Sequence, residues 1–206
     1  MKKVWNREEK LQYERALQAK GYAYIAGVDE VGRGPLAGPV VCAAVIMPLA
    51  DELIIEGVDD SKKLSEKKRE QLAEEIKKRA LYYTIVEVDE KAIDEINILE
   101  ATKQGMKQAI ERLEKQPDMV LTDGNMTIDI SNEQQSVIHG DALSYSIGAA
   151  SIIAKVYRDK LMDEYAKTYP QYAFEKNKGY GTAAHIQAIK EYGICPIHRK
   201  TFTKKF

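Results

Sequence analysis

Residues 27–39 read GVDEVGRGPLAGP, in which two adjacent acids, Asp29 and Glu30, lead into a loop with three glycines, two prolines and one arginine. The preceding run from Tyr22 to Val28 is apolar and strand-like. Two acids at the end of a buried strand repel each other, and one of them tends to stay protonated. A bound cation would remove that cost. Alternatively, the strand ends in a turn and both carboxylates point at water.

The length of 206 residues suits one domain. We assign that domain to 1–206, with a helical N-terminal extension over 1–21 and a basic C-terminal tail over about 194–206. Because no apolar run could span a membrane or form a signal peptide, we expect a cytoplasmic protein with no membrane association. The two cysteines, Cys42 and Cys195, provide neither a disulfide framework nor the spacing of metal ligands.

Hydrophobic periodicity predicts an α/β fold. Helices are expected over about 6–20, Ser65–Ala80, Ile98–Leu113, Leu143–Tyr169 and Thr182–Gly193. Strands are expected over Tyr22–Asp29, Val40–Met47, Leu81–Val88, Met119–Thr122 and Ser136–His139, followed by an extended basic tail over 195–202. Short connections between these elements favour a five-stranded sheet of mixed direction with helices on its faces.

Four acids stand out because each lies near the end of a predicted strand: Asp29, Glu30, Asp123 and Asp141. In open α/β sheets the active crevice lies outside the carboxyl ends of strands. Oxygen ligands without histidine or cysteine favour Mg²⁺ or Mn²⁺, and four carboxylates can hold two such ions about 3.5–4 Å apart. Asp123 and Asp141 could instead serve a turn and a helix cap.

Several sequence blocks together resemble the signature of the ribonuclease HII family. They are DEVGRGPLAGPV (29–40), DSKKLS (60–65), DG (123–124), GD (140–141), AASIIAKVYRD (149–159) and KGYGT (178–182). The blocks occur in order and the resemblance covers about residues 22–202. It implies the ribonuclease H-like fold and metal-dependent hydrolysis of the RNA strand of RNA–DNA hybrids, with incision 5′ to single ribonucleotides embedded in duplex DNA.

The resemblance also assigns roles to residues. It implies that Asp29, Glu30, Asp123 and Asp141 are catalytic and bind two divalent ions, Mg²⁺ or Mn²⁺. The ions would place a bound water in line with the phosphorus and stabilise the leaving 3′ oxygen, giving 5′-phosphate and 3′-hydroxyl ends. It places the following residues in substrate binding: Gly32, Arg33, Gly34, Ser61, Lys62, Lys63 and Tyr180.

The residues themselves leave alternatives to these binding roles. A glycine-rich hairpin can be selected for its geometry alone, a tyrosine between glycines often packs on the surface, and a charged turn often precedes a helix. On the long helix, Ser151, Lys155 and Asp159 recur every four residues. We expect them to support the acids, with Lys155 and Asp159 forming an ion pair in preference to a fifth metal ligand.

The three histidines, His139, His185 and His198, are far apart in sequence, so we expect structural roles, with His198 and Arg199 as an alternative contact to the substrate backbone. The expected partner is an RNA–DNA hybrid or ribonucleotide-containing duplex DNA, bound by a monomer. No glutamine-led sliding-clamp peptide is visible at the C-terminus. Two other functions remain open: a non-catalytic nucleic-acid binding module, and another two-metal nuclease or resolvase on the same fold.

Overall fold

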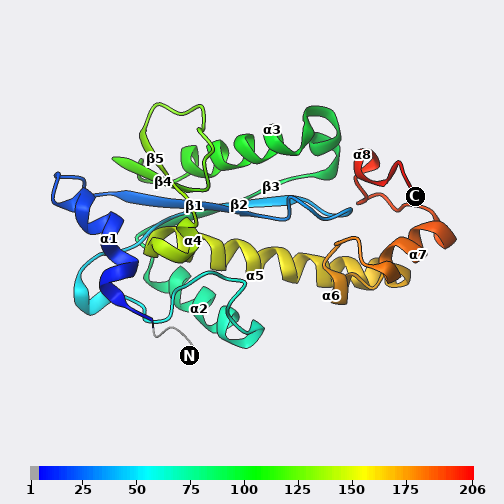
Figure 1. The fold of residues 1–206 in the computed structure, drawn as a ribbon, viewed down its shortest axis with the longest axis horizontal. Coiled ribbons are helices and arrows are strands. Elements are labelled where there is room, and N and C mark those ends of the chain that lie inside the picture. Colours follow the sequence, from blue (N-terminus) through cyan, green and yellow to red (C-terminus); the bar gives the residue numbers. More distant parts are fainter. Residues whose placement is uncertain (1–4) are drawn as a thin grey trace.

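A computed structural model describes residues 5–206 and places a five-stranded sheet at the centre of the protein (Figure 1). The strand order is β3-β2-β1-β4-β5. The bounds are Ile25–Val31 for β1, Val40–Ile46 for β2, Tyr82–Val88 for β3, Met119–Asp123 for β4 and Glu133–Val137 for β5. The β2 strand is antiparallel to β1 and β3, whereas β4 is parallel to β1 and β5. This confirms the predicted mixed sheet.

Helices cover both faces of the sheet (Figure 1). They are α1 (Arg7–Gln18), α2 (Glu66–Arg79), α3 (Glu90–Glu111), α4 (Gly140–Leu143), α5 (Tyr145–Thr168), α6 (Phe174–Asn177), α7 (Ala183–Tyr192) and α8 (Lys200–Thr203). The α3 helix lies on one face, and α5 lies on the other with α1 and α2 outside it (Figure 1). Among residues 5–206, no helix combines the length and apolar character needed to cross a bilayer.

The alternation of β2 explains these layers. All seven residues of the strand are buried. Val41, Ala43 and Val45 join the hydrophobic cluster formed with α5, whereas Cys42, Ala44 and Ile46 join the cluster formed with α3. Because successive side chains of a strand point to opposite faces, one short apolar segment supports both layers.

Several predicted boundaries move. The β1 strand continues through Asp29 and Glu30 to Val31, so both acids lie inside the strand and not beyond its end. The α3 helix starts at Glu90, eight residues before the predicted start, with Asp89 as N-cap and a kink at Asn97, where φ is 67°. The β5 strand spans Glu133–Val137 and not 136–139. The predicted long helix is divided at Ser144, which separates α4 from α5.

Both terminal segments make more contacts with the rest of the protein than we expected. The buried Glu14 of α1 accepts hydrogen bonds from the Ser144 hydroxyl (2.6 Å) and the Ser146 backbone N–H (2.9 Å), so this helix packs against the start of α5. At the other terminus, the tail was expected to be extended. Instead its last residues form α8, and Ala37 pairs with His198 through an isolated β-bridge.

Candidate active site

Asp29 and Asp123 lie side by side because their strands are parallel neighbours. The register pairs Val28 of β1 with Thr122 of β4, and each acid is the next residue of its strand. Asp29 is only 5% exposed. Burial, reinforced by the charges of Glu30 and Asp123, raises the pKa of Asp29 well above its usual value, while a hydrogen bond from Ser151 opposes that rise. A pair of acids thus crowds the end of two central strands.

Asp141 is brought to the same edge by a helix start. The Asp123 carboxylate accepts hydrogen bonds from the backbone N–H groups of Gly140 (2.6 Å) and Asp141 (3.4 Å) at the beginning of α4. Burial, together with the charge of Asp123, raises the pKa of Asp141, and Lys62 opposes this from 3.4 Å. Asp123 therefore acts as a backbone anchor that holds Asp141 beside it.

Glu30 completes the group, which we name the carboxylate edge: Asp29, Glu30, Asp123 and Asp141. The Glu30 carboxylate lies 3.4 Å from the Arg33 guanidinium. Burial raises the pKa of Glu30, Arg33 lowers it, and Asp123 raises it further. Each of the four acids is therefore turned toward its own donor, as expected where like charges repel.

The chemistry of this donor set fits a hard divalent cation. All four side chains are carboxylates, and carboxylate oxygens suit Mg²⁺ and Mn²⁺. Within residues 5–206, however, no three His, Cys, Asp or Glu side chains are arranged to hold a metal ion in the present rotamers. The carboxylates would have to turn from their present donors toward a shared ion, which requires only side-chain rotation.

Residues 32–39, which we name the glycine loop, follow the carboxylate edge directly. Two buried arginines hold its backbone from behind: Arg158 donates to the carbonyls of Ala37 and Pro39, and Arg199 donates to those of Gly32, Arg33 and Gly38. Burial lowers the pKa of Arg158 to about 10 and that of Arg199 to about 9, so both stay charged at neutral pH.

Sequence analysis missed Arg158 and misplaced Arg199. Arg158 stood in a quoted signature block without a role, and Arg199 was considered as a contact to the substrate backbone. The side chain of Arg199 is 0% exposed, so it cannot reach a nucleic acid on the surface. For Arg158 the available signal is an arginine within the largely buried helix α5, since arginine is almost never fully buried unless paired, whereas Arg199 precedes α8 and carries no such signal.

Tyr180 lies against the glycine loop. A Cβ built on Gly34 would be 3.7 Å from its ring, and the ring is 43% exposed. The chain around it is fixed to the loop because the Leu36 N–H donates to the Gly179 carbonyl (2.8 Å) and Arg158 donates to the Lys178 carbonyl (2.9 Å). The loop and the tyrosine, which are far apart in sequence, thus form one surface.

The segment Ser61 to Lys63 divides into an inward and an outward part. Ser61 is 3% exposed, and its hydroxyl hydrogen-bonds the Ser151 hydroxyl at 3.0 Å, so it faces the interior and not a phosphate. Lys62 extends to Asp141, and Lys63 pairs with Asp60 at 3.5 Å. Of the three residues, the two lysines present charge to solvent.

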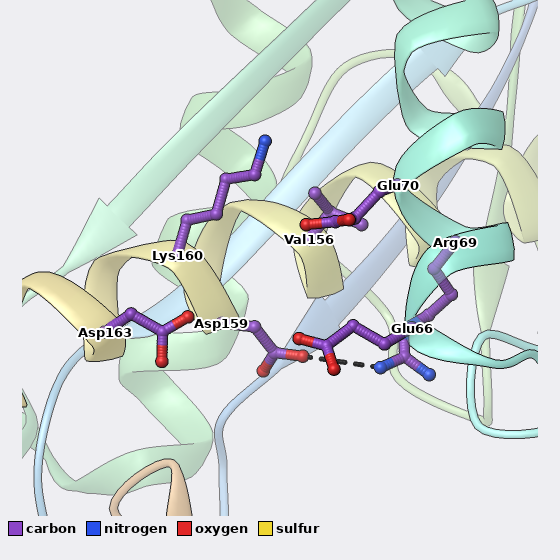
Figure 2. A pocket seen from close by; sticks show the side chains of 7 residues that line it. All are labelled: Glu66, Arg69, Glu70, Val156, Asp159, Lys160 and Asp163. Carbon is purple, nitrogen blue, oxygen red and sulfur yellow. Dashed lines mark ion pairs between the residues drawn. The ribbon is translucent and has the colours of Figure 1, made fainter. Parts of the chain in front are cut away.

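The polar stripe on α5 joins the site to α2. Asp159 pairs with Lys155 at 2.5 Å. It also pairs with Arg69 at 3.7 Å, as Figure 2 shows. Arg69 also donates to the carbonyls of Ser61 (3.1 Å) and Leu64 (2.7 Å). Asp159 therefore pairs with two basic side chains. Arg69, which sequence analysis missed, connects the polar residues of α5 (Ser151, Lys155 and Asp159) to the segment that carries Lys62.

Two histidines lie beneath Tyr180. His185 and His198 are 0% and 2% exposed, and their Nε2 atoms are 3.0 Å apart. The other ring nitrogen of His185 bonds the Tyr180 carbonyl (2.9 Å), and that of His198 accepts from the Cys195 N–H (2.9 Å). Burial excludes the expected alternative of His198 touching substrate. His139 is exposed and precedes α4 with φ of 57°.

A mixed sheet of this order, with carboxylates where β1 and β4 meet, defines the ribonuclease H-like class of metal-dependent nucleases. The chain belongs to the ribonuclease HII family, because the family model described as Ribonuclease HII matches residues 26–205. It is therefore a ribonuclease H, a metal-dependent hydrolase that cleaves RNA internally in RNA–DNA hybrids.

Relatives support this assignment along the whole chain. The ribonuclease HII of Ruminiclostridium cellulolyticum is 56% identical over 199 residues, which cover 97% of this chain and 77% of that protein. That of Caldicellulosiruptor saccharolyticus is 56% identical over 96% of this chain and 95% of its own. The crystal structure of ribonuclease H2 from Pyrococcus horikoshii superimposes with a TM-score of 0.73 at 29% identity, covering 89% of this chain and 96% of that one.

Two other solved structures are similar. A complex of PCNA with ribonuclease HII from Archaeoglobus fulgidus matches with a TM-score of 0.74 at 29% identity, over 86% of this chain and 94% of that chain. A ribonuclease HIII, Bst-RNase HIII, solved in complex with Mn²⁺, matches with a TM-score of 0.61 at 19% identity, over 82% of this chain and 63% of that one. The last comparison supports the fold alone.

Proposed function

We propose that this enzyme incises duplex DNA 5′ to a single embedded ribonucleotide, in addition to hydrolysing longer RNA–DNA hybrids, by a two-metal-ion reaction that leaves 5′-phosphate and 3′-hydroxyl ends. One observation carries the proposal: the carboxylate edge runs without a break into the exposed part of the glycine loop, beside Tyr180. Groups that suit cleavage and groups that suit recognition of a sugar therefore lie within a few residues of each other.

The carboxylate edge would hold the two ions. Asp29 is the most buried of the four acids, and the charges of Glu30 and Asp123 both act on it. These three acids would hold the ions, together with Asp141, which would turn away from Lys62. When bound, Mg²⁺ or Mn²⁺ supplies Lewis-acid stabilisation of the charge on the attacking and leaving oxygens.

Recognition would come from the glycine loop and the residues around it. Arg33 and Gly34 are exposed, and a backbone N–H without a side chain in the way can donate to a 2′-hydroxyl, the group that distinguishes RNA from DNA. The exposed Tyr180 ring offers a stacking surface to the adjoining sugar and base. Lys62 and Lys63, whose side chains are exposed, would contact phosphates on the carboxylate side.

A duplex DNA with one ribonucleotide tests this function directly. We expect a single cut 5′ to the ribonucleotide with Mg²⁺ or Mn²⁺, no cut with chelator, and no cut in the matching all-DNA duplex. Binding without cleavage under either ion would instead indicate a nucleic-acid binding module. Equal cleavage of the all-DNA duplex would indicate a different nuclease. Either of those two results would overturn the proposal.

We further propose that the enzyme acts as a monomer in the cytoplasm. The two cysteines are buried free thiols, a state that a reducing compartment maintains. The acids, the glycine loop and Tyr180 all come from one chain, so the proposed site needs no residue from a second copy. Size-exclusion chromatography with light scattering, on the enzyme alone and with substrate, tests the oligomeric state.

A further inference from the structure

Two positively charged side chains, Arg158 and Arg199, are buried behind the glycine loop. Arg158 and Arg199 are each 0% exposed, and among residues 5–206 neither forms an ion pair with a carboxylate. Their N–H groups go to backbone carbonyls instead, together with the Phe202 ring, which lies 5.2 Å from the Arg199 guanidinium. A buried charge is costly unless it is fully hydrogen-bonded, so the carbonyls must stay pointed at these arginines.

Arg199 determines which way two peptide groups of the loop face. Its guanidinium holds the carbonyl oxygens of Gly32 (2.5 Å) and Arg33 (2.9 Å). In a trans peptide the carbonyl and the following N–H point in opposite directions, and the described chain contains no cis bond. The N–H groups of Arg33 and Gly34 therefore point away from Arg199. Both residues are exposed, and neither N–H donates to another group among residues 5–206.

The remaining bonds prevent the loop from rotating. Arg199 also holds the Gly38 carbonyl through two N–H groups, at 2.8 and 3.0 Å, and the Gly38 N–H donates to the Ile197 carbonyl at 2.8 Å. Arg158 fills the space beneath Gly32, where a Cβ would lie 2.2 Å from its Nε atom. The two free N–H groups are thus held in advance between Tyr180 and the carboxylate edge.

We propose that Arg199 is a positioning residue for ribonucleotide recognition. It turns the Arg33 and Gly34 N–H groups toward the substrate, while Arg158 secures the far end of the same loop. Arg199 does not touch the nucleic acid. The inference rests on the proposed function, in which these N–H groups face the 2′-hydroxyl of the ribonucleotide.

Binding without cleavage isolates this role. Affinity is measured in chelator for two duplexes that differ only in one 2′-hydroxyl, using the wild type, Arg199→Lys and Arg199→Gln. Ile189→Ala is the matched control, since Ile189 packs in the hydrophobic cluster that also contains Leu36 and Ala37 of the glycine loop, and its alkyl side chain donates no hydrogen bond to the loop carbonyls. We expect the preference for the ribonucleotide duplex to fall about tenfold in both Arg199 variants and to survive in Ile189→Ala.

The outcomes separate the inference from the proposed function. If the wild type shows no preference for the 2′-hydroxyl, the proposed function is wrong. If the wild type shows it and both folded Arg199 variants keep it, only the positioning role is wrong. The positioning role would also be overturned if Ile189→Ala lost the preference as much as Arg199 variants of the same thermal stability. General destabilisation would then explain the loss in all of the variants.

A second variant decides the matter if the Arg199 variants do not fold. Gly34→Pro removes the N–H that Arg199 orients and leaves both arginine side chains unchanged, and the position is exposed with only the Tyr180 ring within 4 Å of a Cβ there, at 3.7 Å. We expect this variant to lose the preference for the ribonucleotide duplex and to bind all-DNA duplex as the wild type does. Retention of the preference would show that the oriented N–H plays no part.

Discussion

The carboxylate edge and the glycine loop adjoin in sequence but are stabilised in opposite ways. At the carboxylate edge, buried negative charges face one another, and each acid relies on a side-chain or helix-end donor that could be exchanged. In the glycine loop, buried positive charges face backbone carbonyls and leave few alternatives. Without a cation, the repulsion among the acids of the carboxylate edge is not balanced, and we call this edge electrostatically incomplete. The arginines behind the glycine loop, in contrast, have their hydrogen-bond acceptors before any ligand binds.

The difference indicates a division of labour. An incomplete acid cluster binds cations because binding relieves repulsion, and it tolerates rearrangement of its side chains. Under the proposed function the glycine loop discriminates one hydroxyl group, and donors that could move would weaken that distinction. Fixed backbone donors would then recognise the sugar, while the acids turn toward the ions.

Asp29→Asn is expected to have the largest effect on activity. Removal of the central charge should lower cleavage by about 10³-fold or more, equal to about 4 kcal/mol in the barrier, while hybrid binding in chelator is unchanged. The same substitution should raise the midpoint of thermal unfolding in chelator, because it relieves repulsion with Glu30 and Asp123. Single-turnover cleavage and calorimetry measure the two effects.

Asp129→Asn provides the matched control. Asp129 is an exposed acid paired with Lys107 at 2.9 Å, remote from both regions. It should change neither cleavage nor stability by a measurable amount. A fully active Asp29→Asn enzyme, or one that is less stable than the wild type in chelator, would show that the carboxylate edge is not electrostatically incomplete.

Arg158→Met is expected to be the most destabilising change in the glycine loop region. It leaves the carbonyls of Ala37, Pro39 and Lys178 without donors, which should lower the free energy of unfolding by about 4 kcal/mol. Urea denaturation measures the loss. As control, Arg15→Met removes an exposed pair with Asp51 and should cost no more than about 0.5 kcal/mol. Equal losses would contradict the contrast between buried and exposed arginines.

The histidine pair beneath Tyr180 should make the loop region sensitive to acid. Burial, together with His185, lowers the pKa of His198 to about 4, and burial lowers that of His185. Both rings are neutral in the folded state and take up protons near pH 6.5 once unfolded. Their contribution is therefore complete above pH 6.5 and is lost as pH falls toward 4, by up to about 3 kcal/mol for His198.

His198→Gln checks this prediction. The unfolding free energy of wild type minus that of His198→Gln should shrink between pH 7 and pH 4, because only the wild type loses the stabilisation that requires neutral imidazoles. The difference between the two proteins removes the contribution of the carboxylate edge, whose raised pKa values act in the opposite direction. A difference that stays constant with pH would mean that the pair is not buried as a neutral unit.

Much of this organisation could be predicted from local sequence. The helix starts expected at Ser65 and Thr182, which the structure shows to be N-caps, and the expected mixed sheet agree with the structure because helix starts and strand periodicity are short-range signals. The four acids were identified from positions near strand ends, and the sheet order brings Asp29 and Asp123 together. The part of α3 that precedes Asn97 was missed, because the expected helix began at Ile98, directly after the kink.

The support behind the glycine loop could not be predicted in the same way. Arg199 meets Gly32 across 167 positions, and its partners are carbonyl groups that every residue carries. No residue type therefore marks the contact. Basic residues near the C-terminus read as a surface that binds phosphate, and only burial shows that one of them faces inward. The same reasoning explains why Arg69 was missed, since it too donates to backbone carbonyls.

Substituting one glycine in each region compares the rigidity of the two regions most directly. Gly32 in the glycine loop and Gly124 after Asp123 both have positive φ, 93° and 81°. Alanine at either position incurs backbone strain of about 1 kcal/mol. At Gly32 its Cβ would also meet Arg158 Nε at 2.2 Å and the Pro39 carbonyl at 2.8 Å, whereas nothing lies within 4 Å at Gly124. We expect urea denaturation to show losses of about 2–3 kcal/mol for Gly32→Ala and about 1 kcal/mol for Gly124→Ala. Similar losses for the two variants would mean that the glycine loop accommodates an added Cβ as easily as the turn after Asp123 does. The proposed rigidity of the glycine loop would then have to be abandoned.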